Sequence, residues 1–332
     1  MLNTCIAAVN CRPVLPHSHL VKKKSFHYLW GKSHSPVLEI EPGDRVTFQV
    51  NEVTSSQLTA KSTVADIARL DASKFYPLAG PVRVRGAKAG DALAIDILNV
   101  RTANWGWSAI IPGLGALEEF NEPYLWIWKI GKQNWVGFKN GLRVKRRPFC
   151  GVMGVSPDAD GFTESMPPGN HGGNVDVRHL VAGSRLLLPV WVDGGLFSVS
   201  DVHAAQGDGE VCVTAIECPG EVTLRFNLVR GLHLESPHYF TARGSAVGKS
   251  YVTTGISPDL MEACKQAIRA MIIVLMKCVD LSMEEAYIFC SVAGDLRIHE
   301  IVDKPNWVVG FMISQDSFGP AWKRLGKGQR AS

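Results

Sequence analysis

The segment from residue 170 to residue 217 concentrates the side chains that acid–base or metal chemistry requires. Among glycines and short apolar runs it carries His171, Asp176, Asp201, His203, Asp208, Glu210 and Glu217. Imidazoles and carboxylates bind divalent cations and transfer protons. Glycine lets the backbone turn tightly and approach a ligand closely. The composition of this segment therefore predicts a functional site.

Two pairs in the segment have the spacing of neighbours on one face of a strand. Asp201 and His203 are two positions apart, and so are Asp208 and Glu210. Alternate side chains of a strand point to the same face. If the two pairs flank one hairpin, four groups converge that can hold a divalent metal or pair a base with the group that orients it. The alternative for 207–209 is an ordinary hairpin turn whose glycines supply positive φ.

The motif HGGNVD at 171–176 is a second candidate. Asn174 and Asp176 are same-face neighbours if the chain is extended. Gly172 and Gly173 would let backbone N–H groups reach a small carbonyl substrate, as in an oxyanion hole. A loop in which the Asn and Asp side chains make local turn bonds is the alternative.

Glu217 ends the apolar run TAIE and is a candidate general base. Its pKa would be raised if the site is dry, whereas an exposed glutamate at a strand end is the alternative. Side-chain nucleophiles have weaker support, because no GxSxG elbow, P-loop or GxGxxG motif is present. The apolar neighbours of Cys150 favour a buried thiol with a raised pKa.

Bulk composition limits the classes of function. Of the 332 residues, 46% are hydrophobic and 20% are charged, as in a globular protein with a large core. The net charge of +4 is small, and the basic run RVKRRP at 143–148 is typical of a solvated or strand-flanking segment. Nucleic-acid binding would require more charge with interleaved exposed aromatic residues, so we exclude it.

The cysteines and apolar runs predict the compartment. The eight cysteines form no CxxC pair, and their apolar surroundings indicate buried free thiols in a reducing environment. The first 20 residues lack the apolar run of a secretory signal. The longest apolar helix candidate, 270–279, is too short to span a bilayer. We therefore expect a cytoplasmic protein without a membrane partner.

The elements that must position the candidate residues are mostly strands. The runs 36–52 and 80–100 each resemble two strands around a Gly-Asp turn, which predicts two similar hairpins in one sheet system. Strand patterns resume after residue 180. The sequence 257–259 opens one helix, and Ser282 with Glu285 forms a capping box that opens a second. This order predicts an α+β fold that is mostly β.

Five blocks of this sequence, taken in order, resemble the acetamidase/formamidase family. They are PLAGPVRVRGAKAGDALAIDI, PFCGVMGVSP, HGGNVDVRHLVAGSRLLLPV, GLFSVSDVHAAQGDGEVCVTAIE and EEAYIFCSVAGDLRI. The resemblance covers roughly residues 27 to 310, and its most specific block is HAAQGDGEV. It implies a jelly-roll-like or barrel-like β fold with a small α/β region, and a homo-oligomer of two or more subunits. We expect an N-terminal extension (1–26), a β-rich amidase domain (27–250) and an α+β C-terminal region (251–332) that completes the site.

The chain departs from the family pattern at several positions. Tyr76 stands where the family usually has His before Pro, and Ser200 stands where it usually has Gly. The family's usual Trp-Asp-Asn-like stretch is here Trp30-Gly31-Lys32. Trp30, Tyr76, Gly172 and Gly173 are the candidate substrate contacts.

The resemblance implies hydrolysis of a short aliphatic amide, formamide or acetamide, to a carboxylate and ammonia. His203 and Asp201, with Asp176 or His171, would bind a divalent metal, zinc or calcium, that activates water. Glu217 or Glu210 would take the proton of the water. Asp208 and Asn174 complete the candidate catalytic set. The alternatives are hydrolysis of a urea-like or guanidine-like compound, which Tyr76 motivates, and a small-molecule binding protein without catalysis.

Overall fold

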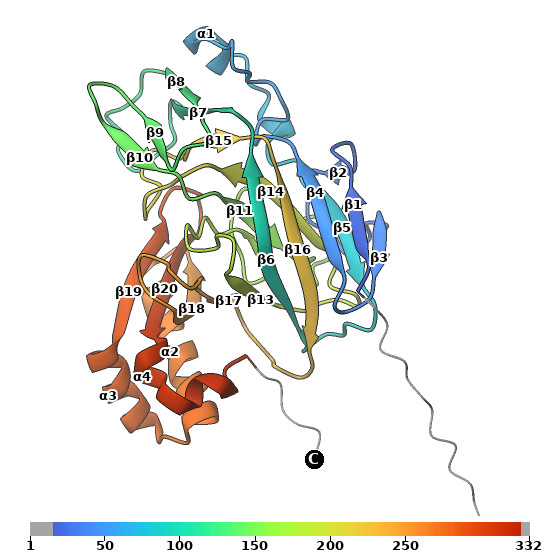
Figure 1. Cartoon of the computed structure of the whole chain (residues 1–332), viewed down its shortest axis with the longest axis vertical. Helices are drawn as coiled ribbons and strands as arrows, with labels where there is room; N and C mark the ends of the chain where they lie inside the picture. The colour runs from blue at the N-terminus through green and yellow to red at the C-terminus, as the bar shows by residue number, and fades with distance from the viewer. Residues whose placement is uncertain (1–15, 327–332) are drawn as a thin grey trace, which may run out of the picture.

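The computed structural model describes residues 16–326, and two sheets dominate it (Figure 1). The strands of the first sheet are, in spatial order, β1 (Ser18–Val21), β4 (Arg45–Val50), β16 (Gly220–Val229), β6 (Ala92–Thr102), β13 (Arg185–Pro189), β17 (His238–Phe240), β18 (Ser250–Ser257), β20 (Trp307–Ser314) and β19 (Gly294–Glu300). Most neighbours are antiparallel, and only β1 pairs with β4 in parallel. The mostly-β prediction is confirmed.

The second sheet carries most of the candidate site. Its main path is β12 (Gly172–Asn174), β11 (Phe149–Gly154), β14 (Phe197–His203), β15 (Glu217–Cys218), β7 (Trp105–Ile110) and β8 (Tyr124–Lys129). Outside this main path, β14 also pairs with β5 (Leu78–Val84). Strand β5 in turn pairs with β2 (Phe26–His27) and β3 (Leu38–Ile40). A separate ribbon joins β9 (Trp135–Gly137) to β10 (Arg143–Lys145).

The two sheets share one apolar core. Phe197 of β14 packs edge-on against Phe48 and Phe226 of the first sheet, with ring centroids 5.9 and 5.0 Å apart. All three side chains are fully buried. This face-to-face packing is that of a sandwich, and the described residues form no closed barrel. The barrel-like part of the expectation is therefore corrected.

The two Gly-Asp turns connect the sheets instead of forming hairpins. β3 and β5 lie in the second sheet, whereas β4 and β6 lie in the first. Each aspartate accepts from the backbone N–H three residues earlier: Asp44 from Glu41 at 3.0 Å, and Asp91 from Lys88 at 3.1 Å. The similarity of the two segments is real, but it produces two equivalent crossings between layers. The prediction of hairpins was wrong.

Three helices, α2 (Leu260–Val279), α3 (Met283–Ala293) and α4 (Gln315–Phe318), gather at one end of the molecule, beside the C-terminal strands (Figure 1). The short helix α1 (Val64–Ile67) lies at the opposite end, and short 3₁₀ turns are present at Ala72–Lys74 and Gly319–Arg324. The capping box that opens α3 is confirmed, because Ser282 Oγ accepts from Glu285 N and Glu285 Oε2 accepts from Ser282 N. β18, β20 and β19 continue the first sheet under α2. No helix in 16–326 combines the length and apolarity needed to cross a membrane.

Candidate active site

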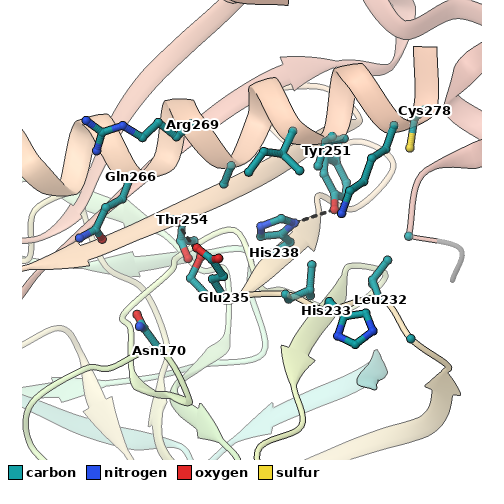
Figure 2. Close-up of a pocket in the computed structure, with 18 of the residues that line it drawn as sticks. Asn170, Leu232, His233, Glu235, His238, Tyr251, Thr254, Gln266, Arg269 and Cys278 are labelled. Carbon is teal, nitrogen blue, oxygen red and sulfur yellow. Dashed lines mark hydrogen bonds between the residues drawn. The ribbon is translucent and has the colours of Figure 1, made fainter. Parts of the chain in front are cut away.

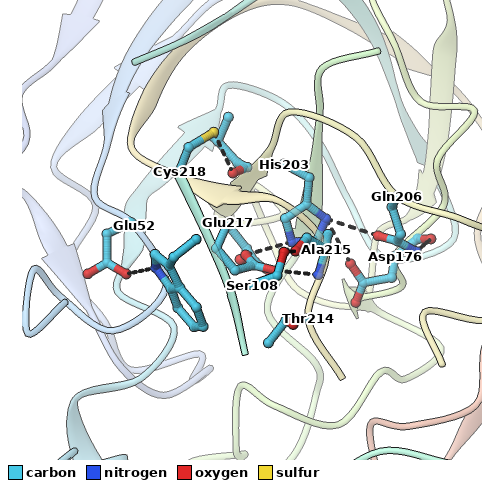
Figure 3. Close-up of polar contacts among 12 residues, drawn as sticks. Glu52, Ser108, Asp176, His203, Gln206, Thr214, Ala215, Glu217 and Cys218 are labelled. Atoms are coloured by element: carbon cyan, nitrogen blue, oxygen red, sulfur yellow. Dashed lines mark hydrogen bonds and ion pairs between the residues drawn. The ribbon is translucent and has the colours of Figure 1, made fainter. Parts of the chain in front are cut away.

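Strands β14 and β15 place three ionisable side chains in contact at the centre of the second sheet. His203 Nε2 lies 3.0 Å from Glu217 Oε2 (Figure 3). The same nitrogen lies 3.2 Å from Asp201 Oδ2. His203 and Glu217 face each other in the antiparallel register of the two strands. All three are buried. The predicted pairing of Asp201 with His203 is confirmed, and Glu217 is not an exposed strand end.

The second nitrogen of His203 faces a different set of partners. His203 Nδ1 lies 3.0 Å from Gln206 Oε1 and 3.5 Å from Asp176 Oδ1 (Figure 3). Gln206 Nε2 donates to the backbone oxygen of Asp176 at 2.9 Å, which fixes the orientation of the amide. Gln206 Oε1 is therefore an acceptor, and His203 Nδ1 must carry a proton. In the neutral imidazole, the lone pair is then on Nε2 and points to Asp201 and Glu217.

The loop after β14 brings Glu210 to the same centre but turns Asp208 away. Glu210 is buried and belongs with Asp176 and His203 to a group of possible ligands. Asp208 instead pairs with Arg297, with Nη1 and Oδ2 2.6 Å apart. The chain at 208–210 is not the second strand of a hairpin, since β15 begins at Glu217. Of the four residues expected to converge, Asp201, His203 and Glu210 do so, and Asp208 does not.

The same ion pair shows that Arg297 does not use the nearest acid in the chain. Asp295 lies two positions earlier on β19, but the partner of Arg297 is Asp208. Asp295 is exposed.

Gly151 on β11 provides the space for this crowded centre. A Cβ atom at this position would overlap Asp176 Oδ1 and would lie 2.9 Å from both Asp201 Oδ2 and His203 Cε1. Asp176 and Asp201 themselves adopt positive φ angles of 45° and 59°. Such backbone strain in non-glycine residues is concentrated at functional sites.

Burial and mutual repulsion perturb the acids of this centre. Burial raises the pKa of Glu217 to about 8, against the opposing effect of His203. Burial also raises the pKa of Asp176 to about 6, and that of Glu210 well above its usual range. Burial lowers the pKa of His203, but the carboxylates of Asp201 and Glu217 outweigh it and raise the pKa overall. The centre therefore has an excess of buried acid that protons or a cation must balance.

The donor atoms fit a divalent cation. Asp201, His203 and Glu217 each offer a ligand atom, and these atoms lie within 4.8 Å of one another; Asp176, His203 and Glu210 form a second such group. Asp201 Oδ1, Asp176 Oδ1 and Glu217 Oε2 are buried without an aligned hydrogen-bond donor. Buried carboxylates without donors are costly unless they are paired or coordinate a metal. Imidazole and carboxylate are the ligands of zinc and related metals.

Two further acids that the sequence analysis missed lie beside the centre. Asp303 and Glu300 are fully buried, and Glu300 Oε2 accepts from the backbone N–H of Val302 and Asp303 at 2.9 and 3.0 Å. Burial and the charges of Asp176 and Glu300 raise the pKa of Asp303 well above its usual range. The only signal in the sequence was two acids three residues apart, one at the end of β19 and one in the loop after it, and their proximity depends on the loop geometry.

Tyr76 also reaches the acids. It is buried, has a φ of 53°, and donates its N–H to Val53 O at 2.8 Å. Burial raises the pKa of its hydroxyl strongly, and the nearby carboxylates, Asp303 and Asp201 foremost, raise it further. Ser200 Oγ donates to Pro77 O at 3.0 Å and so ties this segment to β14. A protonated phenol is thereby held beside the centre.

The HGGNVD motif does not assemble as expected. His171 belongs to neither group of possible ligands; its ring packs edge-on against Trp30 at 5.2 Å, and burial lowers its pKa to about 4. Gly172 N donates to Gly169 O at 2.9 Å, so it is not free to stabilise an oxyanion. The chain turns after Asn174, where β12 ends, so Asn174 and Asp176 are not neighbours on an extended strand.

Trp30 and His171 nevertheless frame a second polar spot. Trp30 Nε1, His171 Nε2 and Asn174 Oδ1 are buried without hydrogen-bond partners. A Cβ on Gly173 would lie 3.1 Å from His171 Nε2 and 3.6 Å from Trp30 Nε1. This polar spot adjoins Gly154 on β11. Gly154 and Gly151, which faces the acid centre, are three residues apart, and at about 3.3 Å per residue this corresponds to about 10 Å along the strand.

A larger cavity lies away from this centre. It has a volume of about 800 Å³ and lies between α2 and the segment 231–236 (Figure 2). His238 Nδ1 and Tyr251 Oη are in contact at 2.8 Å inside it. None of the clustered acids lines it. Its size suits a small molecule, but it lacks the acid–base groups of the carboxylate centre.

Comparison with known proteins identifies the relatives of this chain. Two curated relatives are an acetamidase of Mycolicibacterium smegmatis and a formamidase of Methylophilus methylotrophus, each 26% identical. The first alignment covers 62% of this chain and 66% of the relative, and the second covers 61% and 64%. The chain thus spans slightly less than two thirds of the length of these relatives.

A solved structure and a family profile extend the match to nearly the whole chain. An acetamidase of Bacillus halodurans is 31% identical, with a TM-score of 0.83 over 92% of this chain and 99% of that one. The sequence profile of the Acetamidase/Formamidase family matches residues 16–166 and 159–319. With its sandwich and its buried acid centre, the chain belongs to the acetamidase/formamidase family.

Proposed function

We propose that this protein hydrolyses short aliphatic amides, with formamide or acetamide as first candidates, to a carboxylate and ammonia. The observation that carries the proposal is the buried centre in which three acids, Asp176, Asp201 and Glu217, surround His203. Relatives named acetamidase and formamidase support the choice of substrate. The centre supplies both metal ligands and proton-transfer groups.

Asp201, His203 and Glu217 are the residues that would hold a divalent metal. The proton on His203 Nδ1, which donates to Gln206, leaves Nε2 free to coordinate. Zinc suits this set better than calcium, because calcium takes six to eight oxygen ligands and zinc accepts an imidazole nitrogen. A divalent cation here supplies Lewis acidity, which polarises the amide carbonyl and lowers the pKa of water.

With Glu217 engaged as a ligand, we assign the proton transfer to Glu210. Glu210 belongs with Asp176 and His203 to the other group of possible ligands, so it is not needed in the first group. Glu210 takes the proton of the attacking water and later delivers it to the departing amine. Tyr76, whose hydroxyl stays protonated, donates a hydrogen bond to the developing oxyanion in place of Gly172.

An ammonia-release assay tests the proposal. Wild type, His203→Ala and the control His34→Ala, a half-buried histidine outside the acid centre, are assayed on formamide, acetamide and propionamide, with zinc content measured on the same samples. We expect turnover and about one zinc per chain in wild type and control, and neither in His203→Ala. Undiminished turnover by His203→Ala would exclude the assigned role of His203. Turnover only of ureas or guanidines in a wider panel would favour the alternative substrates.

We further propose a cytoplasmic homo-oligomer. All six cysteines in the described part of the chain are free, which supports a reducing compartment, although only Cys150, Cys218 and Cys290 are buried. Large apolar side chains are exposed on α3 and on β19, an edge strand: Met283, Tyr287, Ile288, Val292, Leu296 and Ile298. Such a patch is typical of a subunit interface. Light scattering on wild type and Val292→Glu tests this, and a monomeric wild type would contradict it.

A further inference from the structure

A small cationic pocket shares Gln206 with the acid centre. Its volume is about 240 Å³, and its polar lining is Gln206, Lys145, Arg147 and Arg178. Gln206 thus contacts the pocket while its amide holds His203 Nδ1 and Asp176 O. Gln206 is therefore common to the two regions.

The basic run at 143–148 is divided between structural contacts and this pocket. Arg143 stacks over the ring of Trp135 at 4.6 Å. Arg146 donates to Gly131 O at 3.1 Å and to Thr102 Oγ1. Lys145 and Arg147, the alternate residues, line the pocket instead. The basic run therefore makes specific structural contacts and lines a pocket, whereas its composition indicated only a solvated segment.

Backbone contacts fix Arg147 beside the acid centre. Its N–H donates to Ala204 O at 2.9 Å, one residue after His203. Arg147 then leads directly into β11, whose Gly151 faces the acids. The cationic side chain is thus carried by the same strands that carry the site.

Positive charge in the pocket is not balanced. Within 16–326, Lys145 and Arg147 have no ion-pair partner, and no acid lines the pocket. The nearest acid to Arg178 is Asp208, with Nε and Oδ1 3.9 Å apart, and Asp208 is already bonded to Arg297 at 2.6 Å. Three cations around a small cavity attract an anion, and arginine binds carboxylates through paired N–H donors.

We propose that this pocket binds a small monocarboxylate, the acid released by hydrolysis, as it leaves the acid centre. The inference rests on the proposed function. Hydrolysis adds water across the C–N bond: a C–O bond forms, the C–N bond breaks, and the amine departs with a proton. The remaining carboxylate is repelled by the buried acids and attracted by the cations beyond Gln206. A cavity of about 240 Å³ holds formate or acetate together with several waters at about 30 Å³ each.

Calorimetric titration of the whole chain with sodium acetate and sodium formate tests this, at constant ionic strength with sodium chloride and sodium sulfate as comparisons. The variants are Arg147→Gln, Lys145→Gln and the matched control Arg143→Gln, which removes a charge from the same run outside the pocket. We expect Arg147→Gln to weaken acetate binding about 10-fold, and Lys145→Gln about 3-fold. Arg143→Gln should bind acetate as wild type does. Acetate inhibition of amide hydrolysis should weaken by the same factors.

The outcomes separate the two proposals. Equal acetate binding by wild type and by both pocket variants would overturn the pocket, even if amides are hydrolysed. Sulfate binding as tight as acetate binding would also overturn it, because the site would then be a general anion site. Acetate binding that depends on Arg147 in a protein that hydrolyses no amide would instead support the pocket and reject the proposed function.

Discussion

The two sides of Gln206 have opposite charge and opposite solvent exposure. On the inner side, Asp176, Asp201 and Glu217 surround His203 and are almost fully buried. On the outer side, Lys145 is exposed, and Arg147 and Arg178 are half-buried. A buried excess of acid requires a cation, whereas a half-open cluster of bases offers a site to an anion. This difference is the basis for our proposal that metal, water and amide are held in the first region and the acid product in the second.

The loop after β14 supplies residues to both sides. Glu210 joins the buried acids, and Asp208, two positions earlier, pairs with Arg297 and lies near Arg178. Two acids only two positions apart in the chain thus lie in different environments. Variants of these residues measure how independent the two regions are.

Loss of a ligand should have the largest effect. In Glu217→Gln we expect zinc content and ammonia release to fall to background, because a neutral amide replaces one of the three ligands of the metal. Metal analysis and the amide assay on the same sample measure this. A variant that keeps one zinc per chain would show that Asp176, His203 and Glu210 hold the metal instead.

Loss of the base should separate metal binding from chemistry. In Glu210→Gln we expect turnover to fall by about 10²–10⁴-fold, the usual contribution of a general base, while zinc content stays at the wild-type level. The combination of kinetics and metal analysis is decisive. Loss of zinc together with activity would place Glu210 among the ligands.

Removal of the residue between the two regions should have an intermediate effect. In Gln206→Ala the proton on His203 Nδ1 loses its acceptor, so we expect zinc affinity to fall by about 10–100-fold. A competition titration with a zinc-binding dye measures the change. Added zinc should restore part of the turnover, and unchanged affinity would exclude the tautomer argument.

Asp208→Asn should have the smallest effect. Because Asp208 pairs with Arg297 outside the acid centre, we expect turnover to change by less than about threefold. Acetate binding should tighten about two- to threefold, since the variant removes the acid nearest to Arg178. Calorimetry measures this small change. A loss of turnover as large as that of Glu210→Gln would restore Asp208 to the catalytic set.

Local sequence patterns predicted the parts of the fold that depend on neighbours in the chain. The capping box of Ser282 and Glu285 forms as expected, because it needs only residues three positions apart. The alternation of Asp201 and His203 likewise placed both on one face of β14. The Gly-Asp turns at Asp44 and Asp91 were found, but their strands separate into two sheets, since turn chemistry does not specify partner strands.

The sequence by itself determined the mostly-β composition, the family and the segment that contains most of the site. Only the tertiary structure decided which acids meet. It brought Glu300, at the end of β19, and Asp303, in the loop after it, to Asp176. It also turned Asp208 toward Arg297 and left His171 packed against Trp30. The physical reason is that burial and charge pairing are set by strands remote in sequence, whereas spacing constrains only residues close in the chain.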